Sequence, residues 1–188
     1  MRKLRVLCSG LMLSLLTCSM VVNTVNVRVR TAAAATVESD EDGEEIYYNE
    51  EDGVKLSDLY EVTGEEELLP VFDPNGVAPL ATWRTYTYLD YTLAPGKTAT
   101  LAAWIYYTAK RKIEVAFTPN KTCTLTVGLK VDASDTIIAL KEVSCTSGTR
   151  KTVTFTINPG TTVNPFILNT SGLSVNLHKP EVSFVCEV

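Results

Sequence analysis

The sequence has little of the side-chain chemistry that enzymes use. It contains one histidine, His178, so a histidine-based catalytic triad would have to use that residue. His178 lies in a Leu-His-Lys-Pro segment that is typical of a surface loop, and the chain has no glycine-rich phosphate-binding motif. Its cysteines and its histidine do not follow the spacing of a metal site. We therefore expect no catalytic residues, no metal, no cofactor and no enzymatic activity.

The first 35 residues have the layout of a secretory signal peptide. A basic start is followed by an apolar run from Val6 to Val22 and by the small residues Ala32 to Ala35, which predict cleavage near Ala35. Two alternatives remain open. The apolar run, which is 17 residues long, could be an uncleaved membrane anchor at the short end of the usual range, or Cys18 could be lipidated. After cleavage we expect no membrane span and a secreted protein, either released or associated with the cell envelope.

Charge divides the rest of the chain into two unlike parts. Residues 38–67 contain 14 acidic residues and one basic residue, a net charge of −13, whereas residues 80–188 contain 11 basic and 7 acidic residues, a net charge of +4. Few large apolar side chains lie in the acidic part, so residues 36–78 are predicted to form a disordered arm and linker. Within it, Ser57-Asp58 could start one helical turn. We expect the arm to contact the basic loop Lys110-Arg111-Lys112 and to compete there with an anionic ligand.

Residues 79–188 are predicted to form an antiparallel two-sheet β-sandwich of about eight strands, immunoglobulin-like or jelly-roll. The evidence is a repeated alternation of apolar and polar residues with a period of two, interrupted by turn residues. In the segment 98–108, for example, Leu101, Ile105 and Tyr107 alternate with Trp104 and Tyr106. Amphipathic helices are absent from this region, which makes the domain all-β.

The stretch from Ile113 to Cys145 also predicts a strand register. If the turn at residues 132–135 centres on Ser134, Cys123 faces Cys145 and Leu125 faces Val143. A Cys123–Cys145 disulfide is then the expected pairing in an exported protein, with Cys186 left over; the alternative is three buried thiols. The turn at residues 118–121 has two interpretations. Either a three-residue loop pairs Phe117 with Cys123, or the flanking strands belong to opposite sheets.

Two groups of side chains are candidates for ligand binding. Tyrosine and tryptophan residues recur in two neighbouring predicted strands, where an exposed row could stack on sugar rings or contact a protein. Two basic groups, 110–112 and 150–151, could share one end of the sandwich and bind an anionic polymer. The candidate ligand-binding residues are Arg84, Tyr86, Tyr88, Lys110, Arg111, Lys112, Arg150 and Lys151.

These features together predict a secreted, non-enzymatic binding or structural module that acts at or outside the cell surface. The alternative is a carbohydrate-binding module that uses an exposed tyrosine and tryptophan strand. The expected partner is a cell-surface polymer, a glycan or a protein, and we expect no nucleic acid.

Overall fold

The structure is a computed structural model that describes residues 38–40, 43–71 and 83–185. The predicted signal peptide, residues 36–37, 41–42 and 72–78 of the predicted arm and linker, and Cys186 lie outside the described residues. Within those three ranges, no helix has the length and apolar character needed to cross a membrane.

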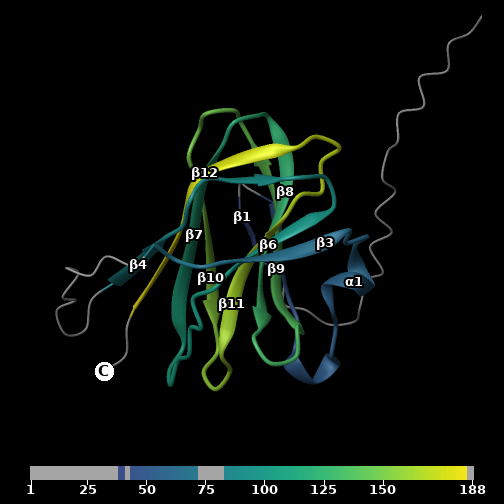
Figure 1. The fold of residues 1–188 in the computed structure, drawn as a ribbon. Coiled ribbons are helices and arrows are strands. Elements are labelled where there is room, and N and C mark those ends of the chain that lie inside the picture. Colours follow the sequence, from purple (N-terminus) through teal and green to yellow (C-terminus); the bar gives the residue numbers. More distant parts are fainter. Residues whose placement is uncertain (1–37, 41–42, 72–82, 186–188) are drawn as a thin grey trace, which may run out of the picture.

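Two packed β-sheets form the molecule (Figure 1). The larger sheet has seven strands in the order β1-β2-β9-β8-β11-β6-β3. The smaller sheet has five strands, with β10-β7-β12-β4 in order and β5 also paired to β12. The strands of the larger sheet are β1 (Glu38–Asp40), β2 (Gly43–Tyr47), β3 (Gly64–Leu68), β6 (Lys97–Leu101), β8 (Cys123–Val131), β9 (Ile137–Cys145) and β11 (Val163–Leu168). Those of the smaller sheet are β4 (Trp83–Thr87), β5 (Tyr91–Leu93), β7 (Arg111–Pro119), β10 (Lys151–Ile157) and β12 (Val175–Val185).

This architecture confirms the predicted all-β sandwich, and the central register is also confirmed. Cys123 is paired with Cys145 and Leu125 with Val143, and the register shifts only after Leu129. The open question about residues 118–121 is answered as well. Strand β7 pairs with β10 and β12 in the smaller sheet, whereas β8 pairs with β9 and β11 in the larger one, so this turn connects opposite sheets.

The main hydrophobic core lies between the two sheets. Alternate residues of strands such as β7 and β10 point into it, as the period of two predicts. In β7, Ile113, Val115 and Phe117 are fully buried, and in β10, Val153 and Phe155 are buried. The core positions inferred from alternation in these strands are therefore correct.

Two predicted strands are shorter than the sequence pattern indicated. The alternation of residues 82–93 predicts one strand, but this segment forms β4 and β5 with a break between them. The segment 98–108 forms β6 only as far as Leu101. Beyond β6, Ile105 makes a single antiparallel bridge to Val163. The last strand, in contrast, continues through Pro180, with a shift of register between His178 and Glu181.

The prediction of a disordered acidic arm is wrong for residues 43–71, which we call the N-terminal strap. Strand β2 pairs with β9 at one side of the larger sheet, and β3 pairs with β6 in parallel at the other edge. The sandwich therefore includes strands that precede the predicted domain boundary at residue 79. Between these strands lie η1 (Glu50–Asp52) and α1 (Leu56–Leu59). The single turn of α1 was expected near Ser57, and the Asp58 carboxylate accepts the backbone N–H of Lys55 at 2.9 Å.

The strap folds because its few apolar residues pack on apolar side chains of the outer face of the larger sheet. Leu56 is buried in a second cluster with Ile137, Leu140, Phe166 and Leu168. Four partly buried strap residues pack against this cluster: Tyr48, Leu59, Tyr60 and Val62. Burial of apolar area in this second cluster offsets the entropy of ordering the acidic segment.

A charged network fastens β3 to the sheet. The Lys130 ammonium group on β8 contacts the Glu65 carboxylate and lies 2.7 Å from the Asp135 carboxylate. Thr100 also donates its hydroxyl hydrogen to Glu65 at 2.5 Å. Burial alone would lower the pKa of Lys130, but its hydrogen bonds to Asp135 and Glu65 outweigh that effect and raise the pKa. Acidic residues on β3 also disfavour edge-to-edge pairing with another sheet.

Candidate functional site

A pocket of about 520 Å³ opens where the edge of the larger sheet meets strand β10. Its walls come from four separate segments: the first part of the strap, Lys110, Ile138 of β9, and the end of β10 with the loop that leads into β11. The lining residues are Glu45, Tyr47, Tyr48, Asn49, Glu50, Lys110, Ile138, Thr156, Ile157, Asn158, Pro159, Thr161 and Val163.

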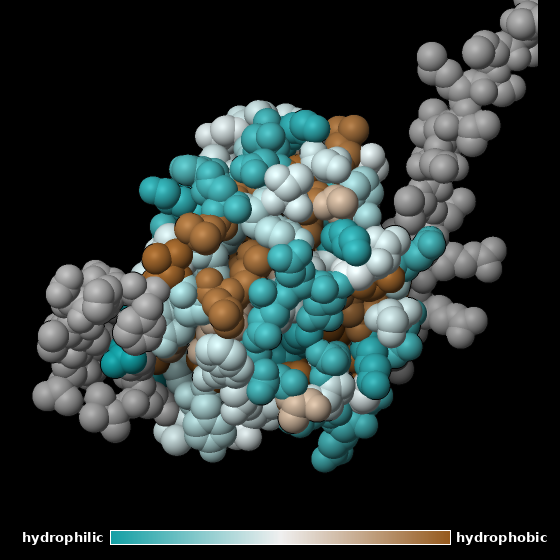
Figure 2. Space-filling view, viewed as in Figure 1, coloured by the Kyte–Doolittle hydropathy of each residue, from teal (hydrophilic) through white to brown (hydrophobic). Residues whose placement is uncertain are grey.

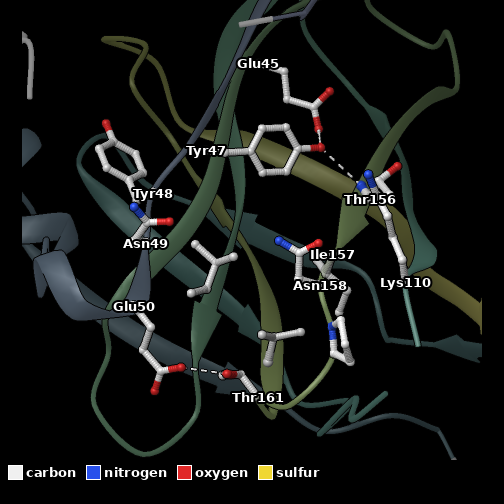
Figure 3. A pocket seen from close by; sticks show the side chains of 13 residues that line it. Glu45, Tyr47, Tyr48, Asn49, Glu50, Lys110, Thr156, Ile157, Asn158 and Thr161 are labelled. Atoms are coloured by element: carbon white, nitrogen blue, oxygen red, sulfur yellow. Dashed lines mark hydrogen bonds between the residues drawn. The ribbon is translucent and has the colours of Figure 1, made fainter. Parts of the chain in front are cut away.

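Tyr47 ties the two sheets together at the pocket wall. Its hydroxyl group donates a hydrogen bond to the Glu45 carboxylate and accepts the backbone N–H of Thr156 at 3.1 Å. The first bond stays within the strap, and the second reaches β10 in the other sheet. The aromatic ring is therefore held in one orientation on the wall (Figure 3).

A second hydrogen bond fixes the opposite end of the pocket. Thr161 donates its hydroxyl hydrogen to the Glu50 carboxylate at 2.6 Å, which joins the β10–β11 loop to η1. The backbone N–H of Tyr48 donates to the carbonyl of Ile138 at 2.8 Å, so this part of the strap is also fixed to β9. In Figure 3 the side chain of Asn158 lies between Tyr47 and the Glu50–Thr161 hydrogen bond.

The chemistry of the pocket is suited to hydrogen bonding. Asn49, Asn158 and Lys110 are exposed and offer amide and ammonium groups, while Ile157 and Val163 are buried in the wall. Burial raises the pKa of Tyr48, and the neighbouring Tyr60 raises it further, so its phenol is a neutral donor at pH 7. In the described part of the chain, no three His, Cys, Asp or Glu side chains are grouped as metal ligands.

The predicted basic site is divided by the fold. The register of β7 and β10 pairs Lys151 with Phe117 and Arg111 with Ile157, so the two basic groups lie at opposite ends of these strands. Six residues of strand separate them by about 20 Å. The prediction that they share one end of the sandwich is wrong, because β10 runs antiparallel to β7.

Individual basic side chains also have different surroundings. Arg150 is paired with Glu181 at 2.5 Å, and Arg111 and Lys151 also have interaction partners. Of the predicted basic residues, Lys110 alone lines the pocket; Lys112 is exposed. A single basic site for an anionic polymer is therefore not assembled from these residues.

The predicted tyrosine row on β4 is not an exposed face. Tyr88 is 1% exposed, and its hydroxyl group donates to the carbonyl of Ala102 at 3.1 Å. Tyr86 is partly buried and packs edge-to-face on Phe184, with ring centroids 5.2 Å apart. Arg84 is exposed at the far end of the strand. Tyr88 is thus a core residue and cannot stack on a ligand.

The two cysteines of the predicted disulfide face each other, and both are thiols in this structure. Cys145 is buried and Cys123 is partly buried. Burial raises the pKa of the Cys123 thiol, although a hydrogen bond with Cys145 acts in the opposite direction. The register allows a bridge between them, and the disulfide itself stays a prediction.

His178 forms a surface pair with Asp90. Its Nδ1 atom lies 2.8 Å from Oδ2 of Asp90, and both side chains are about half exposed, at 59% and 49%. The hydrogen bond with His178, followed by that from the backbone N–H of Lys179, lowers the pKa of Asp90. This pair lies outside the set of residues that line the pocket.

Sequence reasoning missed most of the pocket. Glu45 to Glu50 lie in the segment expected to be disordered, and Asn158 belongs to an Asn-Pro-Gly segment that by itself predicts only a turn. The apolar group Ile46-Tyr47-Tyr48 inside the acidic segment was the available signal, because such residues favour strands.

Comparisons with known proteins give little further information. No family model matches the chain, and no curated protein matches it. One similar solved structure is a chain from work describing Bacillus endospore appendages as a novel family of disulfide-linked pili. It shares 13% sequence identity, covers 62% of this chain and 98% of its own length, and has a TM-score of 0.36. A TM-score of this size does not define a common fold.

Proposed function

We propose that this protein is a non-enzymatic binding module that acts at or outside the cell surface and holds a saccharide in the pocket beside Tyr47. The observation that carries the proposal is the pre-formed pocket, whose opposite ends are fixed by hydrogen bonds from Tyr47 and Thr161. Pre-organised walls lower the entropic cost of binding. The apolar run at residues 6–22 supports export of the chain.

The residues of the pocket favour a saccharide over an anionic polymer. Amide, hydroxyl and phenol groups match the many hydroxyl groups of a sugar, and a partly apolar wall suits the C–H faces of its ring. Two carboxylates and one ammonium group line the pocket, which leaves a net charge of −1. An anionic ligand would meet that negative charge.

The absence of catalysis is also a proposal. The Glu45 carboxylate accepts a hydrogen bond from Tyr47, and the Glu50 carboxylate accepts one from Thr161. Both bonds hold walls of the pocket, which gives each carboxylate a structural role. A bound oligosaccharide should therefore be recovered unchanged in mass after long incubation with the protein.

The test is a glycan array followed by calorimetric titration of neutral oligosaccharides. We expect binding by the exported protein and at least a tenfold loss of affinity in Asn158→Ala and in Lys110→Ala. Lys112→Ala is the matched control, since Lys112 is exposed in the same basic run but does not line the pocket. Equal affinities in Lys110→Ala, Asn158→Ala and the control, or no binding to any glycan, would exclude this site and leave a structural role for the module.

A further inference from the structure

Exposed apolar side chains gather at one place on the surface, and none of them is among the residues that line the pocket. Of six large apolar residues that are exposed in the described part of the chain, five are found here: Leu69 66%, Val71 53%, Leu89 73%, Trp104 50% and Tyr106 54%. We call these five residues the apolar patch. Figure 2 shows apolar side chains gathered on the face where β3 ends.

Hydrogen bonds to backbone carbonyl groups bring the segments of the patch together. The N–H of Ala102 donates to the carbonyl of Leu68 at 3.0 Å, and the hydroxyl group of Tyr88 donates to the carbonyl of Ala102 at 3.1 Å. The N–H of Val71 donates to the carbonyl of Thr87 at 2.7 Å. The end of the strap, the end of β4 and the segment after β6 therefore meet at Ala102, and the patch residues flank these contacts.

Trp104 is the unusual member of the patch. Its φ is +45°, a left-handed conformation that costs a bulky residue about 1–3 kcal/mol. The buried side chain of Asn164 supports this conformation, because its Oδ1 atom accepts the backbone N–H groups of Ala103 at 3.0 Å and Trp104 at 2.7 Å. Its Nδ2 atom donates to Asp132 at 2.6 Å.

Folding alone does not account for a tryptophan at this position. Glycine adopts positive φ without strain, and half of the Trp104 side chain faces water instead of the core. Tryptophan and tyrosine are the residues most enriched at the centres of protein interfaces. The aliphatic neighbours Leu69, Val71 and Leu89 suit a protein surface better than a sugar ring, which needs polar partners.

We propose that the apolar patch is the interface with a second copy of this chain, related by a two-fold axis. The patch lies where β3 and β4 end, and each of these strands carries an exposed charge of opposite sign: Glu67 on β3 and Arg84 on β4. In a dimer with two-fold symmetry the same surface of both copies forms the interface, rotated by half a turn. Strand β3 of one copy therefore faces β4 of the other, and opposite charges meet. The patch residues carry no charge, so their burial requires no desolvation of ions.

Analytical ultracentrifugation of the exported protein over a concentration series tests the proposal. We expect a dimer, and we expect Trp104→Gly and Leu89→Ser each to raise the dissociation constant at least tenfold. Leu173→Ser is the matched control, because Leu173 is 53% exposed outside the patch and should leave dimerisation unchanged. Trp104→Gly should keep the thermal midpoint of the monomer, since glycine relieves the strain; a residue needed only for folding would lower it.

A charge exchange gives an independent readout. Glu67→Arg and Arg84→Glu should each weaken self-association, because both charge contacts of each variant dimer then join like charges. An equimolar mixture of the two variants should restore dimers, since both charge contacts of the mixed dimer join opposite charges. A monomer at all concentrations would overturn the proposal and assign the patch to another protein or to another part of this chain. A dimer that is insensitive to both patch variants would also overturn it.

Discussion

The two faces of the seven-stranded sheet are covered by very different partners. The inner face packs on the five-stranded sheet, with residues such as Phe117 and Phe155 fully buried. The outer face is covered by the strap, which carries ten acidic residues and one basic residue between positions 43 and 71. The five-stranded sheet and the strap both bury apolar side chains completely, since Phe166 beneath the strap is 0% exposed. The comparison shows that strong acidity does not prevent a segment from folding when its few apolar residues meet an apolar surface.

The inner core should show the largest effect of a single truncation. Phe117→Ala removes a fully buried ring between the sheets, and we expect the free energy of unfolding to fall by about 4 kcal/mol. Urea unfolding followed by circular dichroism measures this value. Leu173→Ala, at an exposed position, should change stability by less than about 0.5 kcal/mol. A loss below about 1 kcal/mol for Phe117→Ala would contradict its place in the main core.

Oxidation of the facing cysteines should change the free energy of unfolding by the next largest amount. A Cys123–Cys145 bridge closes a loop of about 20 residues, so its reduction should lower the free energy of unfolding by about 3 kcal/mol. Unfolding with and without reductant measures the difference, and Cys123→Ser should abolish the dependence on reductant. Alkylation of the exported, unreduced protein should label Cys186 and spare the pair. Equal labelling of all three thiols would rule out the bridge.

A truncation beneath the strap should destabilise the strap without loosening the inner core. Leu56→Ala removes the buried anchor of the outer cluster, and we expect a loss of about 2–3 kcal/mol. Hydrogen exchange should accelerate at strap amides such as those of Tyr48 and Tyr60, while β7 and β10 stay protected. Glu61→Ala, at an exposed strap position, is the control. Equal loss of protection across both sheets would mean that strap and sandwich unfold as one unit.

Of the changes considered, alkaline pH should lower the free energy of unfolding least. The raised pKa of Lys130 means that its ion pairs stabilise the fold fully below its ordinary pKa of 10.5 and lose this contribution as pH rises through the higher folded value. Burial, followed by a hydrogen bond to Glu66, raises the pKa of Tyr91 to about 12, so the fold also loses stability as pH rises above 10.

Both groups contact the strap strand β3, which should therefore detach first at high pH. Circular dichroism during urea unfolding at pH 9 and pH 11 measures the change, and Lys130→Met should reduce its size. A stability in the wild-type protein that is constant between these pH values would contradict the role of this network.

The fold class could be predicted from local pattern alone. Apolar and polar residues alternate in β7, β8 and β10, and this period places Val115, Leu125 and Phe155 in the core regardless of how the strands are ordered. The pairing of Cys123 with Cys145 also followed from the sequence, because β8 and β9 form a hairpin whose register depends on one short turn. Strand pairing between neighbours in sequence needs little information from the rest of the chain.

Packing between segments far apart in the sequence determined the strap, the pocket and the backbone conformation of Trp104. The buried partners of Leu56 in the outer cluster, such as Ile137 and Phe166, lie far along the chain. Asn158 and Tyr47 meet in one pocket because the β2 edge of one sheet lies beside β10 of the other. The strained backbone of Trp104 depends on Asn164, sixty residues later. Sequence periodicity reports which side of a strand is buried, but it carries no information about which distant surface buries it, and that is why the strap and the pocket emerged only in three dimensions.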